Sequence, residues 1–160
     1  MKDIYKILDG LNIQYKIYDH PPFYTCEEAD LFYSHLDSGK IKNLFLRNAK
    51  GNQHFLLLLE SHKSLNISDF GQSISQKGLG FASEERLAKY LGLKKGSVSP
   101  FGLINDESHD VCVYIDKDIL LHDSLLFHPN VNTSTLQISR DDFQKFIGST
   151  GNLILYHDFA

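Results

Sequence analysis

The chain has few of the residues that define several common protein classes. Its only cysteines, Cys26 and Cys112, lie far apart in 160 residues that hold no tryptophan. Such spacing fits neither a four-ligand zinc site nor the disulfide framework of a small secreted domain. The longest uninterrupted apolar run, FLLLL at 55–59, is too short to span a membrane, and the N-terminus lacks the apolar segment of a signal peptide. We therefore expect a soluble, cytoplasmic protein in a reducing environment.

Positive charge is also scarce. Lysine and arginine number 16 against 20 aspartates and glutamates, which gives a formal net charge of −4. Non-specific binding to nucleic acid needs a basic face, so the balance excludes a general nucleic-acid coat. Contact with one short end of a nucleic acid needs only a few local cations and stays open. The apolar content of 42% and the length predict one domain spanning residues 1–160.

Helix-like and strand-like segments alternate along the chain. Apolar spacing and capping residues predict helices at 4–11, 26–36, 84–91 and 141–148, with a weaker one within 64–75. Alternation and turn residues predict strands at 13–18, 41–48, 53–60, 101–105, 111–116 and 133–139, with a short one within 78–81, and the strands at 41–48 and 53–60 form a hairpin. Thr25 with Glu28, and Ser139 with Asp142, have the spacing of helix caps. We expect an α+β (mixed α/β) domain with a largely antiparallel, curved sheet and surrounding helices.

The usual signatures of covalent and metal-dependent catalysis are missing. The sequence has no Gly-x-Ser-x-Gly elbow and no recognisable Cys-His signature, and its 8 histidines show no metal-ligand spacing. We expect no metal and no cofactor.

The stretch GSVSPFG at 96–102 is the first candidate for a site. Glycine allows positive φ, and proline fixes the bend. The N–H groups of Ser97, Val98 and Ser99, between Gly96 and Pro100, could converge on an anion or oxyanion. A plain turn between helix and strand explains the same residues.

Two further segments carry candidate polar groups. If GKIKNLF forms a strand, Lys40 and Lys42 project to one face, and Asn43 projects to the other. A lysine there could hold a phosphate or a carbonyl oxygen, or could be solvated at a sheet edge. His128, in FHPN at 127–130, could line a site or serve only the loop before a strand.

Taken together, five separated motifs resemble the YbaK/prolyl-tRNA-synthetase-associated editing family. They occur in one order and cover nearly the whole chain: KNLFLRN, FASEERLAKYLG, GSVSPFGLIND, FHPNVNTSTLQIS and the DDFQKF helix. Within the family, the chain looks most like the free-standing alanyl-tRNA(Pro) deacylases. The C-terminal STGNLILYHDFA departs from the Gly-His-rich ending of the family, which leaves the packing of the tail open.

The resemblance implies hydrolysis of mischarged tRNA(Pro) in trans. It places the signature lysine at Lys42, with Asn43 beside it as a polar contact or a brace for the strand. It makes Gly96–Pro100 the backbone cradle of the scissile ester, lets the ligand approach the backbone at Gly102, and gives His128 a substrate-positioning role. The implied partners are the acceptor end of aminoacylated tRNA(Pro) and prolyl-tRNA synthetase.

Three other functions fit part of the pattern. Cysteinyl-tRNA(Pro) deacylation, of the YbaK type, would use the same fold and site. A catalytically idle module could bind tRNA or the synthetase, although the intact Lys42 and Gly-Pro loop argue against that role. A non-tRNA esterase would cleave a simple amino-acid ester as fast as charged tRNA.

Overall fold

The computed structural model describes residues 2–23 and 26–159. Its strands are β1 (Tyr15–Asp19), β2 (Gly39–Arg47), β3 (His54–Glu60), β4 (Gly80–Phe81), β5 (Val111–Asp116), β6 (Ser124–Phe127), β7 (Ser134–Ser139) and β8 (Ile154–His157). Its helices are α1 (Ile4–Gly10), α2 (Cys26–Tyr33), α3 (Ile67–Ser73), α4 (Glu84–Leu91), α5 (Arg140–Ser149) and the 3₁₀ segments η1 (Pro100–Asn105) and η2 (Lys117–Leu121). The strands form one mixed sheet in the order β1-β7-β6-β2-β3-β5-β8, and β4 pairs with β2.

The expected class and hairpin are confirmed. Strands β2 and β3 pair antiparallel, and β3 is buried at every residue, as its continuous apolar pattern predicted. The β1–β7, β6–β7 and β2–β4 pairs are also antiparallel, whereas β2–β6, β3–β5 and β5–β8 are parallel. Helices α4 and α5 begin at the predicted caps Ser83 and Ser139. The Thr25 cap lies outside the described residues.

One element was predicted wrongly. FGLIN at 101–105 is not a strand but lies in η1. The Ser99 hydroxyl accepts a hydrogen bond from the Phe101 N–H at 3.1 Å, and Pro100, with φ already fixed and no N–H to satisfy, starts the helical turn. An apolar run alone does not distinguish a short buried helix from a buried strand.

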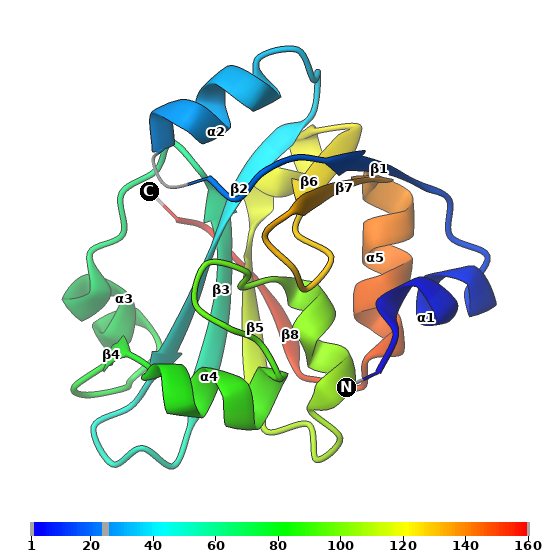
Figure 1. Ribbon diagram of the computed structural model, residues 1–160. Coiled ribbons are helices and arrows are strands. Elements are labelled where there is room, and N and C mark those ends of the chain that lie inside the picture. The colour runs from blue at the N-terminus through cyan, green and yellow to red at the C-terminus, as the bar shows by residue number, and fades with distance from the viewer. Residues whose placement is uncertain (1, 24–25, 160) are drawn as a thin grey trace.

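The two faces of the sheet carry separate hydrophobic clusters. The larger cluster joins β2, β3, β5, β6 and β7 to α1, α4, η1 and α5, with Phe101, Phe143 and Phe146 fully buried. The smaller cluster lies on the other face and includes Phe70 of α3 and Phe159 near the C-terminus. Figure 1 shows α3 on the opposite side of the sheet from α1 and α5. The tail thus packs through β8, beside β5, and Phe159.

Candidate active site at the open edge of strand β2

Strand β2 has an edge that is only partly paired. One edge pairs with β3 from Ile41 to Arg47. The other edge pairs with β6 at Gly39 and Lys40, and with β4 at Leu46 and Arg47. Between those two contacts, no strand within the described part of the chain covers the second edge.

Asn43 lies in the middle of this open stretch. The Phe45 carbonyl accepts from the Ala82 N–H on the open edge, so the alternation of the strand places the Asn43 N–H and C=O on that same edge. The Asn43 Oδ1 is buried and has no hydrogen-bond partner in the structure. A buried polar atom left unsatisfied costs stability, and such atoms are often kept where a function needs them.

Two cavities meet at Asn43. The first, of about 180 Å³, lies between α2, the start of β2 and the end of β6, and its lining includes Tyr33, Lys40, Ile41 and His128. The second, of about 430 Å³, lies between β2, the β4–α4 segment and the loop before η1. Its lining includes Leu44, Phe81, Lys95 and Val98. The open edge of β2 is therefore the floor of a groove, called the β2 groove below.

The loop at 96–100 reaches this groove through Val98, which lines the larger cavity. Gly96 has φ 91°, a conformation that favours glycine. The Ser97 N–H and hydroxyl both donate to the Lys94 carbonyl, at 3.1 and 2.9 Å, so Ser97 offers no free donor. Among the described residues, nothing accepts a hydrogen bond from the N–H of Val98 or Ser99. Of the three donors expected from the sequence, the Val98 N–H is therefore the one available at the groove, because Ser99 is fully buried and lines neither cavity.

His128 lies in the smaller cavity as a neutral ring with a fixed tautomer. Its Nδ1 is 3.0 Å from the Ser134 carbonyl, which can only accept, so the proton is on Nδ1 and Nε2 carries a lone pair. Burial lowers the pKa of His128, and the nearby His20 lowers it further, against the opposing effect of the Ser134 bond. The ring is therefore a hydrogen-bond acceptor at neutral pH.

The comparisons with known proteins agree with this geometry. The family model for the aminoacyl-tRNA editing domain matches residues 20–146. The prolyl-tRNA editing protein ProX of Acetoanaerobium sticklandii is 41% identical over 145 residues, 91% of this chain and 88% of that protein. The prolyl-tRNA synthetase associated domain-containing protein 1 of Mus musculus is 30% identical over 149 residues, 91% of this chain and 88% of that protein.

The chain belongs to the aminoacyl-tRNA editing domain family. It is accordingly an aminoacyl-tRNA deacylase, a hydrolase of the ester between an amino acid and its tRNA. The crystal structure of a candidate trans-editing enzyme for prolyl tRNA synthetase has the same fold, with a TM-score of 0.74 over 99% of this chain and 97% of that one, at 17% identity. No helix among the described residues is long and apolar enough to cross a membrane.

Two residues expected in the editing site lie outside the groove. The Lys42 ammonium donates to the Lys63 carbonyl on the face of the smaller cluster, and Lys42 lines neither cavity. The lysine in the smaller cavity is Lys40. Gly102 packs against the end of α4, where an added Cβ would lie 2.7 Å from Leu93 Cδ1. Its lack of a side chain therefore serves packing against Leu91 and Leu93.

The sequence analysis also missed groups that line the β2 groove. Tyr33 comes from α2, and Phe81 comes from the two-residue strand β4. The short strand before α4 was expected, but its pairing with β2 and the packing of α2 beside β2 were not, because both depend on contacts distant in sequence. The presence of Lys40 in the smaller cavity has a partial signal in the GKIKN segment, because this lysine lies near the start of the strand.

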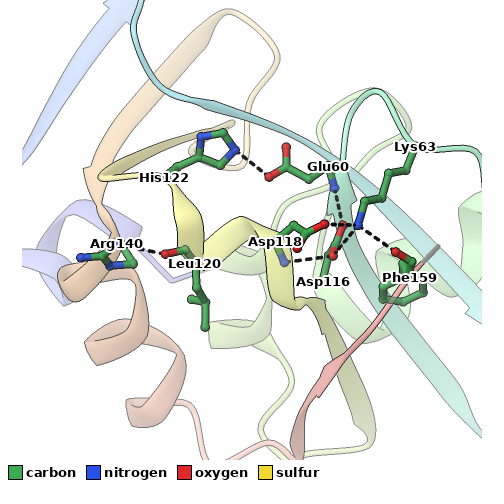
Figure 2. Close-up of polar contacts among 8 residues, drawn as sticks. All are labelled: Glu60, Lys63, Asp116, Asp118, Leu120, His122, Arg140 and Phe159. Atoms are coloured by element: carbon green, nitrogen blue, oxygen red, sulfur yellow. Dashed lines mark hydrogen bonds and ion pairs between the residues drawn. The ribbon is translucent and has the colours of Figure 1, made fainter.

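A second polar cluster lies at the far end of β3, next to the editing domain's C-terminal tail (Figure 2). Lys63 Nζ lies 2.9 Å from Asp116, 2.7 Å from Asp118 and 2.8 Å from the Phe159 carbonyl. Burial alone would lower the pKa of Lys63, but the two carboxylates outweigh it and raise that pKa. Beside this cluster, His122 Nε2 contacts Glu60 Oε1 at 2.6 Å. These contacts join β3, η2 and the tail.

Proposed function

We propose that this deacylase hydrolyses alanyl-tRNA(Pro) in trans, in the cytoplasm, after prolyl-tRNA synthetase has attached alanine by error. The prolyl-tRNA editing name of the 41% identical relative supports the tRNA, and the resemblance of the FASEERL and FHPNVNTST segments supports alanine. The observation that carries the chemistry is the free Val98 N–H in a groove that also holds Asn43 and His128.

The reaction is attack of water on the ester carbonyl. Attack places negative charge on the carbonyl oxygen, and fixed N–H donors stabilise that charge without reorganisation, each contributing about 3–4 kcal/mol. The Val98 amide, which faces the larger cavity, supplies one such donor. An aminoacyl ester is activated compared with a peptide, so oriented donors and a positioned water suffice without a nucleophilic side chain. The terminal ribose hydroxyl and the His128 Nε2 lone pair help to place the water.

Selectivity is assigned to the smaller cavity. Alanine is smaller than proline, so a synthetase pocket for proline cannot exclude it, and each missing methylene provides only about 1–3 kcal/mol of discrimination. A second site that excludes proline by size completes the selection. The cavity of about 180 Å³ beside Tyr33 and Ile41 is assigned to the alanyl side chain.

Lys42 acts in this proposal as a positioning residue. Its ammonium holds the turn after β3 through the Lys63 carbonyl, and it precedes Asn43 on the strand whose open edge forms the groove. A charged hydrogen bond of this kind contributes about 1.5–3 kcal/mol. Holding β2 in place keeps the Asn43 backbone on the groove side.

A panel of charged tRNAs tests the assignment. Purified protein is mixed with alanyl-, cysteinyl- and prolyl-tRNA(Pro) and with alanine ethyl ester, with and without EDTA. We expect rapid loss of alanine from tRNA(Pro), little loss of proline, and no effect of EDTA. Preferred cleavage of cysteinyl-tRNA(Pro) would overturn the substrate, and equal cleavage of the simple ester would overturn the role of tRNA.

The backbone donor is tested by Val98→Pro, which removes one N–H. Loss of one oxyanion donor is expected to reduce kcat by about 10²–10³-fold. Val98→Ala keeps the N–H and serves as the matched control, so its kcat should stay within a few-fold of wild type. Equal kcat for both variants would remove the Val98 amide from the mechanism.

A further inference from the structure

Phe81 is an aromatic side chain held open to solvent at the rim of the β2 groove. It is 63% exposed although it lines the cavity of about 430 Å³. Exposed single apolar residues are common on protein surfaces and need no ligand. Phe81 differs because it forms one wall of a cavity that adjoins the proposed ester site.

The backbone that carries this ring is fixed on both sides. Phe81 pairs with Leu46 of β2, and the next N–H, from Ala82, donates to the Phe45 carbonyl at 2.9 Å. Ser83 follows as the cap of α4, accepting from the Arg86 N–H. Because the backbone is already fixed, covering the ring with a flat ligand restricts only its two side-chain torsions.

The rest of the cavity suits a nucleotide base. Its apolar walls come from Leu44, Phe45, Leu87 and Val98, and its charged groups are Lys95 and Glu84. Cavities of about 300–1,000 Å³ with apolar walls and a few polar groups are typical of small-molecule sites. An ammonium suits a phosphate, and a carboxylate accepts a hydrogen bond from an exocyclic amine. One cation and one anion therefore orient a ligand that has a phosphate at one end and an amino-purine at the other.

We infer that the terminal adenine of the charged tRNA stacks on Phe81. The inference rests on the proposed function. In every charged tRNA the ester is carried by the ribose of the terminal adenosine, so the base must lie within one nucleotide of the reacting carbonyl. With the alanyl group in the smaller cavity and the ester beside Asn43, which lines both cavities, the base lies in the larger one. Lys95 binds the phosphate of that nucleotide, and Glu84 accepts from the adenine amine.

The test compares two substrates in wild type and in Phe81→Ala. One is alanyl-tRNA(Pro) with its natural terminal adenosine, and the other is the same tRNA ending in an abasic ribose. Loss of one stacked base typically reduces affinity by about 5- to 100-fold. We expect Phe81→Ala to raise KM by that factor for the natural substrate and to leave KM unchanged for the abasic one, while Phe81→Tyr behaves like wild type on both.

Controls separate this inference from the proposed function. Leu121→Ala removes a side chain that is 79% exposed on η2, and it should leave KM unchanged for both substrates. Wild-type protein that cleaves neither charged tRNA would defeat the proposed function itself. Wild-type cleavage combined with equal losses on both substrates in Phe81→Ala, or with no loss on either, would overturn the stacking role alone.

Discussion

The two polar regions beside β2 and β3 are built in opposite ways. In the cluster around Lys63, each charged group has a partner: Asp116 accepts from Lys63 and from the N–H groups of Glu60 and Asp118. In the β2 groove, the Asn43 Oδ1 and the Val98 N–H have no partner among the described residues. The first region uses its polar groups to hold the fold, and in our proposal the second keeps them for a ligand.

This difference indicates where each kind of mutation should act. Satisfied buried charges stabilise only as a set, so removing one leaves its partners uncompensated. Groups kept free for a ligand contribute little to folding, so changing them affects activity first. Four substitutions test the contrast.

Asp116→Ala should have the largest effect on stability. The side chain is about 1% exposed, and its loss removes the buried carboxylate that faces Lys63 and leaves two backbone N–H groups without their acceptor. Breaking a buried ion pair in this way costs about 3–5 kcal/mol. Urea unfolding measures the change. Asp118→Ala, which removes the exposed partner of the same lysine, is the matched control and should cost much less; equal losses would contradict the distinction.

Lys42→Ala should lower kcat/KM for alanyl-tRNA(Pro) by about 10- to 100-fold, the equivalent of one charged hydrogen bond. The ammonium joins the two regions, because its acceptor is the carbonyl of Lys63. Lys42→Arg keeps the charge and the donor and should recover much of the activity. A loss confined to the melting temperature, with full activity in the folded protein, would assign Lys42 to the first region only.

Much of this contrast could be predicted from local sequence, and part of it could not. The caps at Ser83 and Ser139 and the β2–β3 hairpin depend on neighbouring residues, so local patterns reveal them. The Gly96 loop was also found, through its glycine and proline. The direction of Lys42 was not, because alternation tells which residues share a face of a strand but not which face adjoins a cavity.

The strands β6 and β8 show the same limit. Ser124–Phe127 is four residues long, and Ile154–His157 follows a glycine-containing turn, so neither has a pattern long enough to predict a strand. Both are fixed by tertiary pairing, with β2 and β7 for β6 and with β5 for β8. The pairing of β6 with only the start of β2 creates the groove, so the site itself depended on contacts distant in sequence.

Gly96→Ala should reduce activity about tenfold. It should lower the free energy of unfolding by less than Asp116→Ala does. The added Cβ would meet only Asn132 Nδ2, at 3.8 Å, so space is available and the cost comes from the positive φ of 91°. Strain of about 1–3 kcal/mol would shift the loop and the Val98 and Ser99 amides with it. Gly148→Ala, in the open on α5, is the matched control and should be neutral or slightly stabilising. Full activity in Gly96→Ala would separate the loop's conformation from its function.

The smallest effect should come from acid titration of His128. Because burial lowers its pKa below the usual 6.5, the neutral acceptor form persists to a lower pH than in an exposed histidine. We expect the kcat/KM of wild type to fall several-fold as the pH drops below 6.5. The His128→Gln variant should have a lower kcat/KM at neutral pH and should not show this fall. At pH values between the lowered pKa of folded His128 and the usual pKa of the unfolded chain, the unfolded chain binds a proton that folded His128 does not. The free energy of unfolding therefore also decreases as the pH is lowered through this range. Circular dichroism at each pH must therefore show folded protein. An unchanged acid limb in His128→Gln would mean that another group in the groove titrates, and would remove the Nε2 lone pair from the placement of water.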